Sequence, residues 1–228
     1  MISNQRVVAL VPMKAHSERV ANKNVRLFAG RPLYEHILET LEQTPAVDRV
    51  IVDTDSDTIA QNAPESFSKV AVLVRPVELR GDHMSMNNVI AHDVDQVPGD
   101  IYVQTHATNP LLSSDTIGAA LERFVGSHEH DSLFSVNSYY SRFYHLDGRP
   151  INHDPQKLIR TQDLPPVFEE NSCIFVFTKR SFAGAGNKRI GRRPLMFDMN
   201  RIESIDIDDE CTFNLAEILA IHAHQTTR

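Results

Sequence analysis

The sequence "RVVALVP", residues 6–12, indicates the fold class, because it is apolar at every position from 7 to 11 and rich in valine. A strand without polar alternation is typical of a sheet that is covered on both faces. Similar runs recur along the chain: "RVIVDTD" (49–55), "KVAVLV" (69–74), "DIYVQTH" (100–106), "LFSVNS" (133–138) and "CIFVFT" (173–178). We expect these segments to form one buried sheet.

Helical patterns separate these strands. Apolar residues recur at helical spacing at Leu33, Ile37, Leu38 and Leu41, and again at Ile117, Ala120, Leu121, Phe124 and Val125. Serines mark helix starts, at Ser56 and at Ser113 or Ser114, because a serine oxygen accepts hydrogen bonds from first-turn amides. The alternation predicts an α/β fold with a doubly wound, mostly parallel sheet.

Composition limits the kind of partner. The chain has 228 residues, a net charge of −7 and 41% hydrophobic residues, which predicts one sizeable domain with an insertion. A broad basic surface is missing, so we expect no nucleic-acid partner, and an anionic ligand should be small.

Cysteine usage and hydropathy predict a cytoplasmic protein. There are only two cysteines, Cys173 and Cys211, without CxxC or Cys/His ligand spacing, which argues against disulfides and structural zinc. The apolar part of the N-terminal "MISNQRVVALVP" is too short for a signal peptide. No apolar segment of the sequence approaches the ~18 residues that a membrane-spanning helix needs. We therefore expect no membrane contact.

Residues 139–170 interrupt the alternation. They contain the turn signal "DG" and several prolines but no long helical pattern. We interpret them as a hairpin and an extended excursion that covers the site or a partner subunit.

The loop "MKAHSERVANKN", residues 13–24, follows the first strand and concentrates Lys14, Arg19 and Lys23 without a glycine. In doubly wound sheets ligands bind at the carboxyl ends of the strands, where this loop lies. The cations would repel one another unless they hold an anion such as phosphate, although a solvated basic loop remains an alternative. The loop matches neither GxxxxGK[ST] nor GxGxxG.

A second motif is "SIDIDDE", residues 204–210. If it is extended, Asp206 and Asp208 point to the same side and Ile205 and Ile207 to the other. Adjacent carboxylates favour a bound Mg²⁺. Alternatively, an aspartate caps the following helix, and for Asp209 we prefer that role.

The capped helix would be "ECTFNLAEILAIHAH", with Phe213, Leu215, Ile218 and Leu219 facing the core. Arg75, at a strand end, could recognise a polar ligand or pair with Glu78.

The motifs together resemble the acylneuraminate cytidylyltransferases. The resemblance rests on "VALVPMKAHSERVANKN", "VIVDTDSDTIA", "RPVELRGD", "THATNPLL", "RTQDLPPVFEENSCIFVF" and "SIDIDDECTFNLAEIL", in this order over nearly the whole chain. It implies a Rossmann-like α/β fold with a small dimerisation excursion, and hence a homodimer. It also implies Mg²⁺-dependent transfer of CMP from CTP to the anomeric hydroxyl of a 2-keto sugar acid, with release of pyrophosphate.

The resemblance also implies site residues. Those on the nucleotide side are Lys14, Ser17, Arg19, Lys23, Asn24, Arg75 and Ser85, where Arg75 would contact the base and Lys23 the α-phosphate. Asp206 and Asp208 would hold the metal, in agreement with the strand alternation. On the acceptor side stand His106, Arg160, Gln162, Glu170 and Asn171, and Arg160 could bind the acceptor carboxylate through its guanidinium.

Three departures concern the substrate. Lys14 stands where the family usually has arginine, His106 where it often has glutamine, and Phe175 where it often has tyrosine. The leading hypothesis is a cytidylyltransferase for a nonulosonate such as N-acetylneuraminate, pseudaminate or legionaminate. The alternatives are an enzyme of the same fold that uses another acid, 3-deoxy-octulosonate or a phosphonate, and an inactive nucleotide-binding protein.

Overall fold

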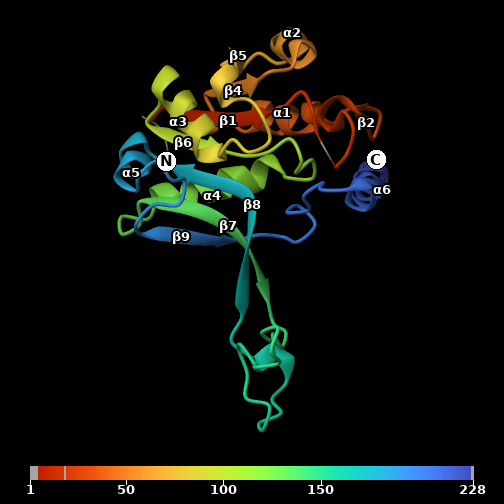
Figure 1. The fold of residues 1–228 in the computed structure, drawn as a ribbon, viewed down its shortest axis with the longest axis vertical. Helices are drawn as coiled ribbons and strands as arrows, with labels where there is room; N and C mark the ends of the chain where they lie inside the picture. The colour runs from red at the N-terminus through yellow and green to blue at the C-terminus, as the bar shows by residue number, and fades with distance from the viewer. Residues whose placement is uncertain (1–4, 18, 227–228) are drawn as a thin grey trace.

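A seven-stranded sheet forms the centre of the computed structural model, which describes residues 5–17 and 19–226 (Figure 1). Its strand order is β5-β4-β1-β6-β8-β7-β9. The strands are β1 (Val7–Met13), β4 (Arg49–Thr54), β5 (Val70–Val74), β6 (Ile101–Gln104), β7 (Ser132–Tyr139), β8 (Val167–Phe177) and β9 (Pro194–Asp198). A separate short pair consists of β2 (Leu27–Phe28) and β3 (Arg31–Pro32).

The sheet is mostly parallel, as expected. β5, β4, β1 and β6 run parallel, whereas β8 is antiparallel to both β6 and β7. β9 extends the sheet by pairing in parallel with β7, and the sequence pattern did not predict this short strand. The other predicted strands are confirmed, with shifted ends.

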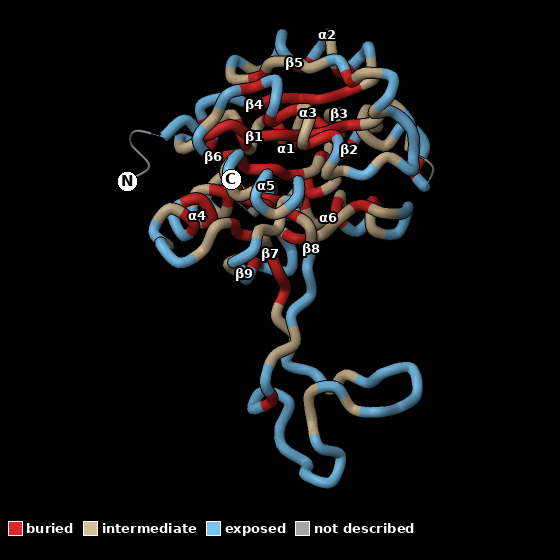
Figure 2. The backbone as a smooth tube through the Cα atoms, turned by 60° about the vertical axis from the view of Figure 1, so that its left-hand side comes forward, coloured by how far each residue is buried: buried red, intermediate tan, exposed pale blue. Residues whose placement is uncertain are grey.

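Helices cover both faces of the sheet. α1 (Leu33–Gln43), α2 (Asp57–Ser66) and α4 (Ser114–Val125) pack on one face, and α3 (Met86–Gln96) and α5 (Lys179–Gly184) on the other. β1 supplies Val7, Ala9 and Val11 to the first core and Val8 and Leu10 to the second, which explains its continuous apolar run. The buried backbone is concentrated in this sheet (Figure 2).

The predicted helix starts are confirmed at α2 and α4. The Ser56 side chain accepts a hydrogen bond from the Ile59 amide at 3.4 Å, and Ser113, rather than Ser114, accepts one from the Thr116 amide at 3.2 Å. These caps satisfy amides that have no partner inside the helix.

The last helix, α6 (Glu210–Thr226), begins at a cap, as expected for Asp209, which accepts a hydrogen bond from the Thr212 amide at 2.8 Å. The predicted core face was partly wrong. Phe213 is buried, but Leu215 and Ile218 are 48% and 65% exposed. Ala216 and Ala220 are the buried residues instead, because small side chains let α6 lie close to the loop after β1.

The excursion is a long projection from the body (Figure 1). β7 and β8 form its base by pairing Val136 with Glu170 through to Tyr139 with Val167. Beyond them, residues 140–166 are mostly exposed (Figure 2), with a turn in which the Gly148 amide donates to the His145 carbonyl at 2.9 Å. The "DG" turn is therefore confirmed.

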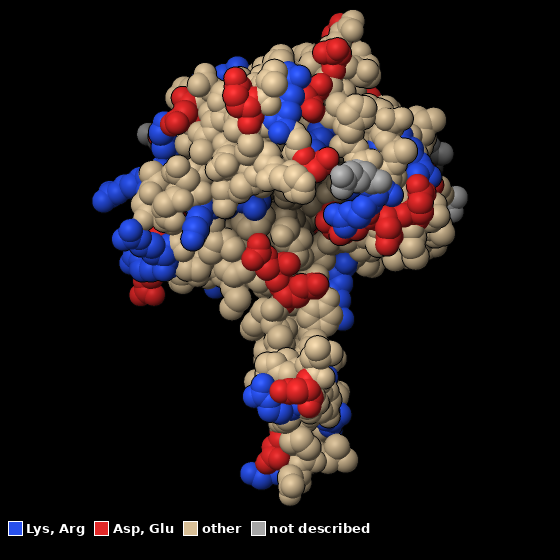
Figure 3. Space-filling view, in the orientation of Figure 1, with Lys and Arg blue, Asp and Glu red and all other residues tan. Residues whose placement is uncertain are grey.

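The described residues also form three short 3-10 helices: η1 (Lys23–Val25), η2 (Val77–Leu79) and η3 (Thr161–Asp163). Across the described residues, none of the helices combines the length and the apolar character that a bilayer-spanning segment requires. Acidic and basic side chains are interspersed on the face shown in Figure 3, which carries no continuous basic surface.

Candidate active site

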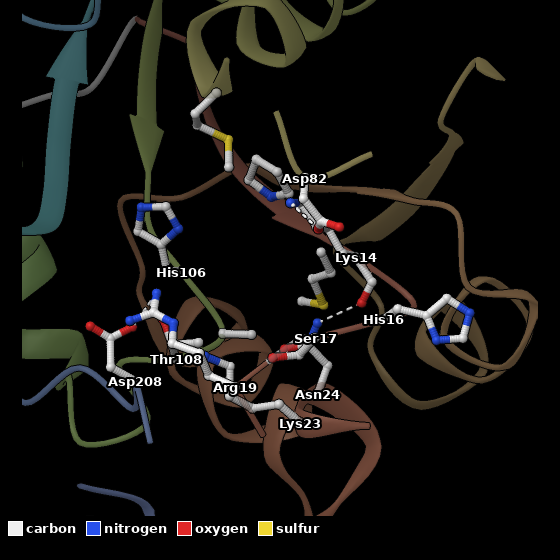
Figure 4. Close-up of a pocket in the computed structure, with 14 residues that line it drawn as sticks. Lys14, His16, Ser17, Arg19, Lys23, Asn24, Asp82, His106, Thr108 and Asp208 are labelled. Atoms are coloured by element: carbon white, nitrogen blue, oxygen red, sulfur yellow. Dashed lines mark hydrogen bonds and ion pairs between the residues drawn. The ribbon is translucent and has the colours of Figure 1, made fainter. Parts of the chain in front are cut away.

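A pocket of about 370 Å³ opens where β1 and β6 end (Figure 4). The predicted residues that line it are Lys14, Ser17, Arg19, Lys23, Asn24, His106 and Asp208, together with Pro12, Met13, His16, Asp82, Met86, Ala107 and Thr108. His106 and Asp208 lie on one side of the pocket, and Lys14 and His16 on the other. The pocket brings together parts of the chain that are distant in sequence. Lys23 Nζ, for example, donates a hydrogen bond to the carbonyl of Ile207, which lies 184 positions further along the chain.

The loop after β1 is fixed at several points. The Ala15 amide donates to Asp55 Oδ1 at 2.7 Å, and Asn24 Nδ2 donates to the Lys14 carbonyl at 2.9 Å. Val20 is 1% exposed and packs with Phe28 and the start of α6. The apolar anchor at Val20 and these hydrogen bonds hold the flanking cations at the pocket.

The pocket pairs its cations with carboxylates from other parts of the chain. Lys14 Nζ lies 3.1 Å from Asp82 Oδ1, and Arg19 Nη2 lies 2.9 Å from Asp208 Oδ1. Lys23 Nζ donates to the Ile207 carbonyl. Burial lowers the pKa of Lys23, while Asp206 and Asp208 act in the opposite direction. The loop is therefore not simply solvated, because its cations contact carboxylates and a carbonyl of the pocket, although the Arg19 and Asp208 side chains remain 66% and 48% exposed.

Residues 204–208 do not form a strand, and of the two predicted metal ligands Asp208 lines the pocket whereas Asp206 does not. The Ile207 amide donates to the Thr108 carbonyl at 2.9 Å, and Ile207 is fully buried. Asp206 is half-buried, and burial raises the pKa of its carboxyl, against a hydrogen bond from Thr108. Asp208 lies on the pocket wall.

These two carboxylates fit a magnesium ion. Asp206 Oδ1 is buried and has no hydrogen-bond partner, which leaves an oxygen available as a ligand. Mg²⁺ is commonly held by one or two carboxylates together with substrate phosphate oxygens and water. Asp206 and Asp208 would supply the first part of such a set.

Arg75 and Ser85 do not line the pocket. Arg75 is 2% exposed, its Nε forms an ion pair with Asp53, and its Nη2 donates to the Asp53 carbonyl at 3.0 Å. Of the two predicted alternatives, pairing with Glu78 is therefore wrong, because the partner of Arg75 is Asp53. Ser85 is exposed at the start of α3, next to Met86, which does line the pocket.

The predicted acceptor residues are spread over three places. His106 lines the main pocket, and Glu170 lines an adjoining one. Asn171 accepts a hydrogen bond from Ser135 Oγ within the sheet. Arg160 and Gln162 are exposed on the projection, where Arg160 Nε lies 2.7 Å from Asp163 Oδ2, so the structure does not bring them to the pocket.

Gln104 connects His106 to Arg189, and its orientation is fixed by its neighbours. Its Oε1 accepts from Arg189 Nη1 at 2.6 Å, and its Nε2 donates to the Thr105 carbonyl at 2.9 Å. The same Nε2 lies 3.0 Å from His106 Nε2. Because an amide nitrogen only donates, His106 Nε2 accepts, and the proton of the neutral ring is on Nδ1.

The charge state of His106 agrees with this tautomer. Burial, with smaller contributions from Arg189 and Lys23, lowers the pKa of His106 to about 4. The imidazole is therefore neutral near pH 7 and presents one donor and one acceptor.

A family model described as "Cytidylyltransferase" matches residues 8–194, which span the first loop, the sheet and the projection. The chain belongs to the cytidylyltransferase family. The match ends before Asp206 and Asp208, so the placement of these residues rests on the structure.

Known relatives of this cytidylyltransferase chain act on sugar acids, according to their names. It is 26% identical over 226 residues to an N-acylneuraminate cytidylyltransferase of Escherichia coli O18:K1:H7 (strain RS218 / NMEC), covering 92% of this chain and 51% of the relative. It is 28% identical over 227 residues to the CMP-N,N'-diacetyllegionaminic acid synthase of Legionella pneumophila, and the match covers 94% of this chain and 96% of the relative. The chain spans about half the length of the N-acylneuraminate cytidylyltransferases that it matches.

A solved structure has the same fold. The CMP:2-keto-3-deoxy-manno-octonic acid synthetase complexed with CTP superposes with a TM-score of 0.70, at 14% identity, and the match covers 96% of this chain and 99% of that one. The Rossmann-like α/β fold of the cytidylyltransferase chain is thereby shown.

Several lining residues of this cytidylyltransferase were not predicted. Thr108 lies in the loop after β6, a position that could have indicated it, whereas Asp82 lies in a turn between η2 and α3 that carries no such signal. Arg189 lies in a loop between α5 and β9 with no recognisable motif, so only its position in space connects it to His106.

Proposed function

We propose that the protein transfers CMP from CTP to the anomeric hydroxyl of a 2-keto sugar acid and releases pyrophosphate. The observation that carries the proposal is the single pocket in which Lys14, Arg19 and Lys23 face Asp208, with Asp206 beside it. The cations suit a triphosphate, and the carboxylates that lie among them suit its metal. The preferred acceptor is a nonulosonate, in line with the names of the relatives from E. coli and L. pneumophila.

The residues act mainly by positioning and neutralisation, as in phosphoryl transfer generally. Lys14, Arg19 and Lys23 would hold the triphosphate and offset the charge that develops on departing pyrophosphate. Before substrate binds, Asp82 and Asp208 neutralise two of these cations, so the triphosphate would replace them as the counter-charge.

Asp206 and Asp208 would hold Mg²⁺, which when bound would polarise phosphate and hydroxyl oxygens as a Lewis acid. Arg19 would then exchange its contact with Asp208 for phosphate oxygens. The exposed ion pair between them contributes little free energy, which makes the exchange easy.

Pyrophosphate release tests the proposal. The protein is mixed with CTP, Mg²⁺ and each member of a panel of nonulosonates, and the CMP-sugar is identified by mass spectrometry. We expect release with at least one acid, loss of release with EDTA, and little release when ATP replaces CTP. Absence of release with every acid on the panel would contradict the proposal.

A second candidate keeps CTP but changes the acceptor to 3-deoxy-octulosonate or another acid. His106 favours it, because this residue stands in the pocket wall where the resemblance leads us to expect glutamine, and a neutral imidazole offers one donor fewer than an amide. The chain is also 30% identical, over 119 residues, to a 3-deoxy-manno-octulosonate cytidylyltransferase of Chlorobium phaeobacteroides. Turnover of the octulosonate with no turnover of any nonulosonate would decide for this candidate.

The proposal includes a homodimer and a cytoplasmic location. The projection exposes large apolar side chains that a second subunit could cover, namely Tyr140, Tyr144, Leu146, Ile151, Leu158 and Ile159. Both cysteines are free, which suits a reducing compartment. Light scattering coupled to size exclusion would give twice the 25.7 kDa chain mass for a dimer.

A further inference from the structure

A smaller pocket of about 220 Å³ adjoins the first. Its lining residues are Asn87, Glu170, Phe175, Lys188, Arg189 and Ile190. The two pockets share a boundary, because Met86 lines the first and Asn87 the second, and because Gln104 joins His106 to Arg189. A ligand that extends past His106 would therefore enter the smaller pocket.

Arg189 is rigidly held in this pocket. Its Nε donates to Asn87 Oδ1 at 3.1 Å, its Nη1 donates to Gln104 Oε1 at 2.6 Å, and its guanidinium lies 4.2 Å from the centre of the Phe175 ring. Three elements thus orient it, α3, β6 and β8. A guanidinium that is fixed in this way loses little entropy when it binds a ligand.

The charge of Arg189 is not balanced within the protein. It is half-buried, and among residues 5–17 and 19–226 no carboxylate forms an ion pair with it and no group accepts a hydrogen bond from its Nη2. Burial lowers the pKa of Arg189, and only Glu170 acts in the opposite direction. A desolvated cation with unused donors is costly unless an anion completes it.

We propose that Arg189 binds the carboxylate of the acceptor sugar acid and thereby fixes the acceptor next to the nucleotide pocket. This inference rests on the proposed function. A carboxylate is the one anionic group that a 2-keto sugar acid carries, and guanidinium binds carboxylates through paired hydrogen bonds. Arg160, which the sequence suggested for this role, is exposed and already paired with Asp163.

The neutral partners of Arg189 support this assignment. Asn87 and Gln104 orient the guanidinium through amide oxygens and leave its full positive charge to the ligand. Glu170, in the same pocket, could accept hydrogen bonds from sugar hydroxyls, and its charge would oppose a polyanion such as the triphosphate more strongly than a single carboxylate. The pocket therefore suits a polyhydroxylated monoanion better than a nucleotide.

Steady-state kinetics with Arg189→Met test the inference, using the acid that the wild-type protein turns over. Methionine keeps much of the apolar stem against Phe175 but removes the charge. We expect the KM for the acid to rise about 10- to 100-fold, the range for losing a charge-assisted hydrogen bond, while the KM for CTP stays unchanged. The acceptor KM of Arg189→Lys should lie between those of wild type and Arg189→Met, because lysine keeps the positive charge but cannot form the paired hydrogen bonds of a guanidinium.

Arg192→Ala is the matched control, an exposed arginine of the same loop that lines neither pocket. It should leave both KM values unchanged, and calorimetry with CTP and Mg²⁺ should show that every variant is folded. An unchanged acceptor KM in Arg189→Met, or an equal rise in both KM values, overturns the inference while the proposed function stands. If the wild-type protein turns over no acid, the proposed function itself fails, and this inference fails with it.

Discussion

Replacing Asp93 with asparagine should remove a pH dependence from the stability of the protein. Asp93 is fully buried on α3 next to Asp53, which is also fully buried and holds Arg75. Burial, and then the charge and hydrogen bond of Asp53, raise the pKa of Asp93 to about 9, with Arg75 acting in the opposite direction. The two carboxyls therefore share a proton that Asp93 would lose in the unfolded chain above about pH 4.

The direction and the size of the pH effect on stability follow from this proton. Between the unfolded and folded pKa values the native state binds one more proton, so the free energy of unfolding falls as pH rises, by about 1.4 kcal/mol per pH unit. From pH 5 to pH 8 this amounts to about 4 kcal/mol. Asparagine carries no titrating proton and can still donate to Asp53, so the variant should lose this slope and gain stability relative to wild type at pH 8.

Urea unfolding at pH 5, 6, 7 and 8 measures the effect as the difference in unfolding free energy between wild type and Asp93→Asn. His92 also lies in this cluster, so His92→Gln is measured alongside to separate its contribution. Asp95→Asn is the control, because Asp95 is on the same helix but 70% exposed in its pair with Lys179. A difference that does not change with pH would refute the shared proton.

Further predictions concern the pocket and a helix cap. Lys23→Ala should lower turnover by about 10²-fold or more, as for loss of an oxyanion donor, and unchanged turnover would remove Lys23 from the reaction. Asp208→Asn should abolish turnover with little change in Tm, because its ion pair with Arg19 is exposed, and unaltered Mg²⁺ dependence would contradict its metal role. Ser113→Ala should cost about 1 kcal/mol in urea unfolding, against a smaller loss for Ser114→Ala, and equal losses would refute the cap.

Most of the fold was predictable because its signals are local. The run from Val7 to Val11 is apolar on both sides, and the helical spacing at Leu33, Ile37, Leu38 and Leu41 matches side chains that are all fully buried. β9 was missed because its pairing with β7 depends on a neighbour that is distant in sequence. The face of α6 was misjudged because burial depends on what lies opposite, and α6 presents alanines to the loop after β1.

The residues of the site could be predicted where a sequence motif directly follows a predicted strand. Lys14 reaches the pocket because it directly follows the end of β1, and Asp208 because the Ile207 amide binds the Thr108 carbonyl in the segment after β6. Arg75 also follows a strand, but the sequence could not show that Asp53 would hold it in the core, since charge pairing across strands has no local pattern. Arg189 could not be predicted for the same reason. Its role is inferred from contacts with Asn87, Gln104 and Phe175, which are distant in sequence.

The hydrogen bonds from Arg189 through Gln104 to His106 have a direction, and this direction limits what the site can do. If His106 took up a proton at Nε2, two donors would face each other, and Gln104 would have to rotate its amide. The rotated amide would turn its NH₂ group towards Arg189 and its oxygen towards the Thr105 carbonyl, so both of those contacts would be lost. His106 can therefore become protonated at Nε2 only if Arg189 also loses its hydrogen bond to Gln104.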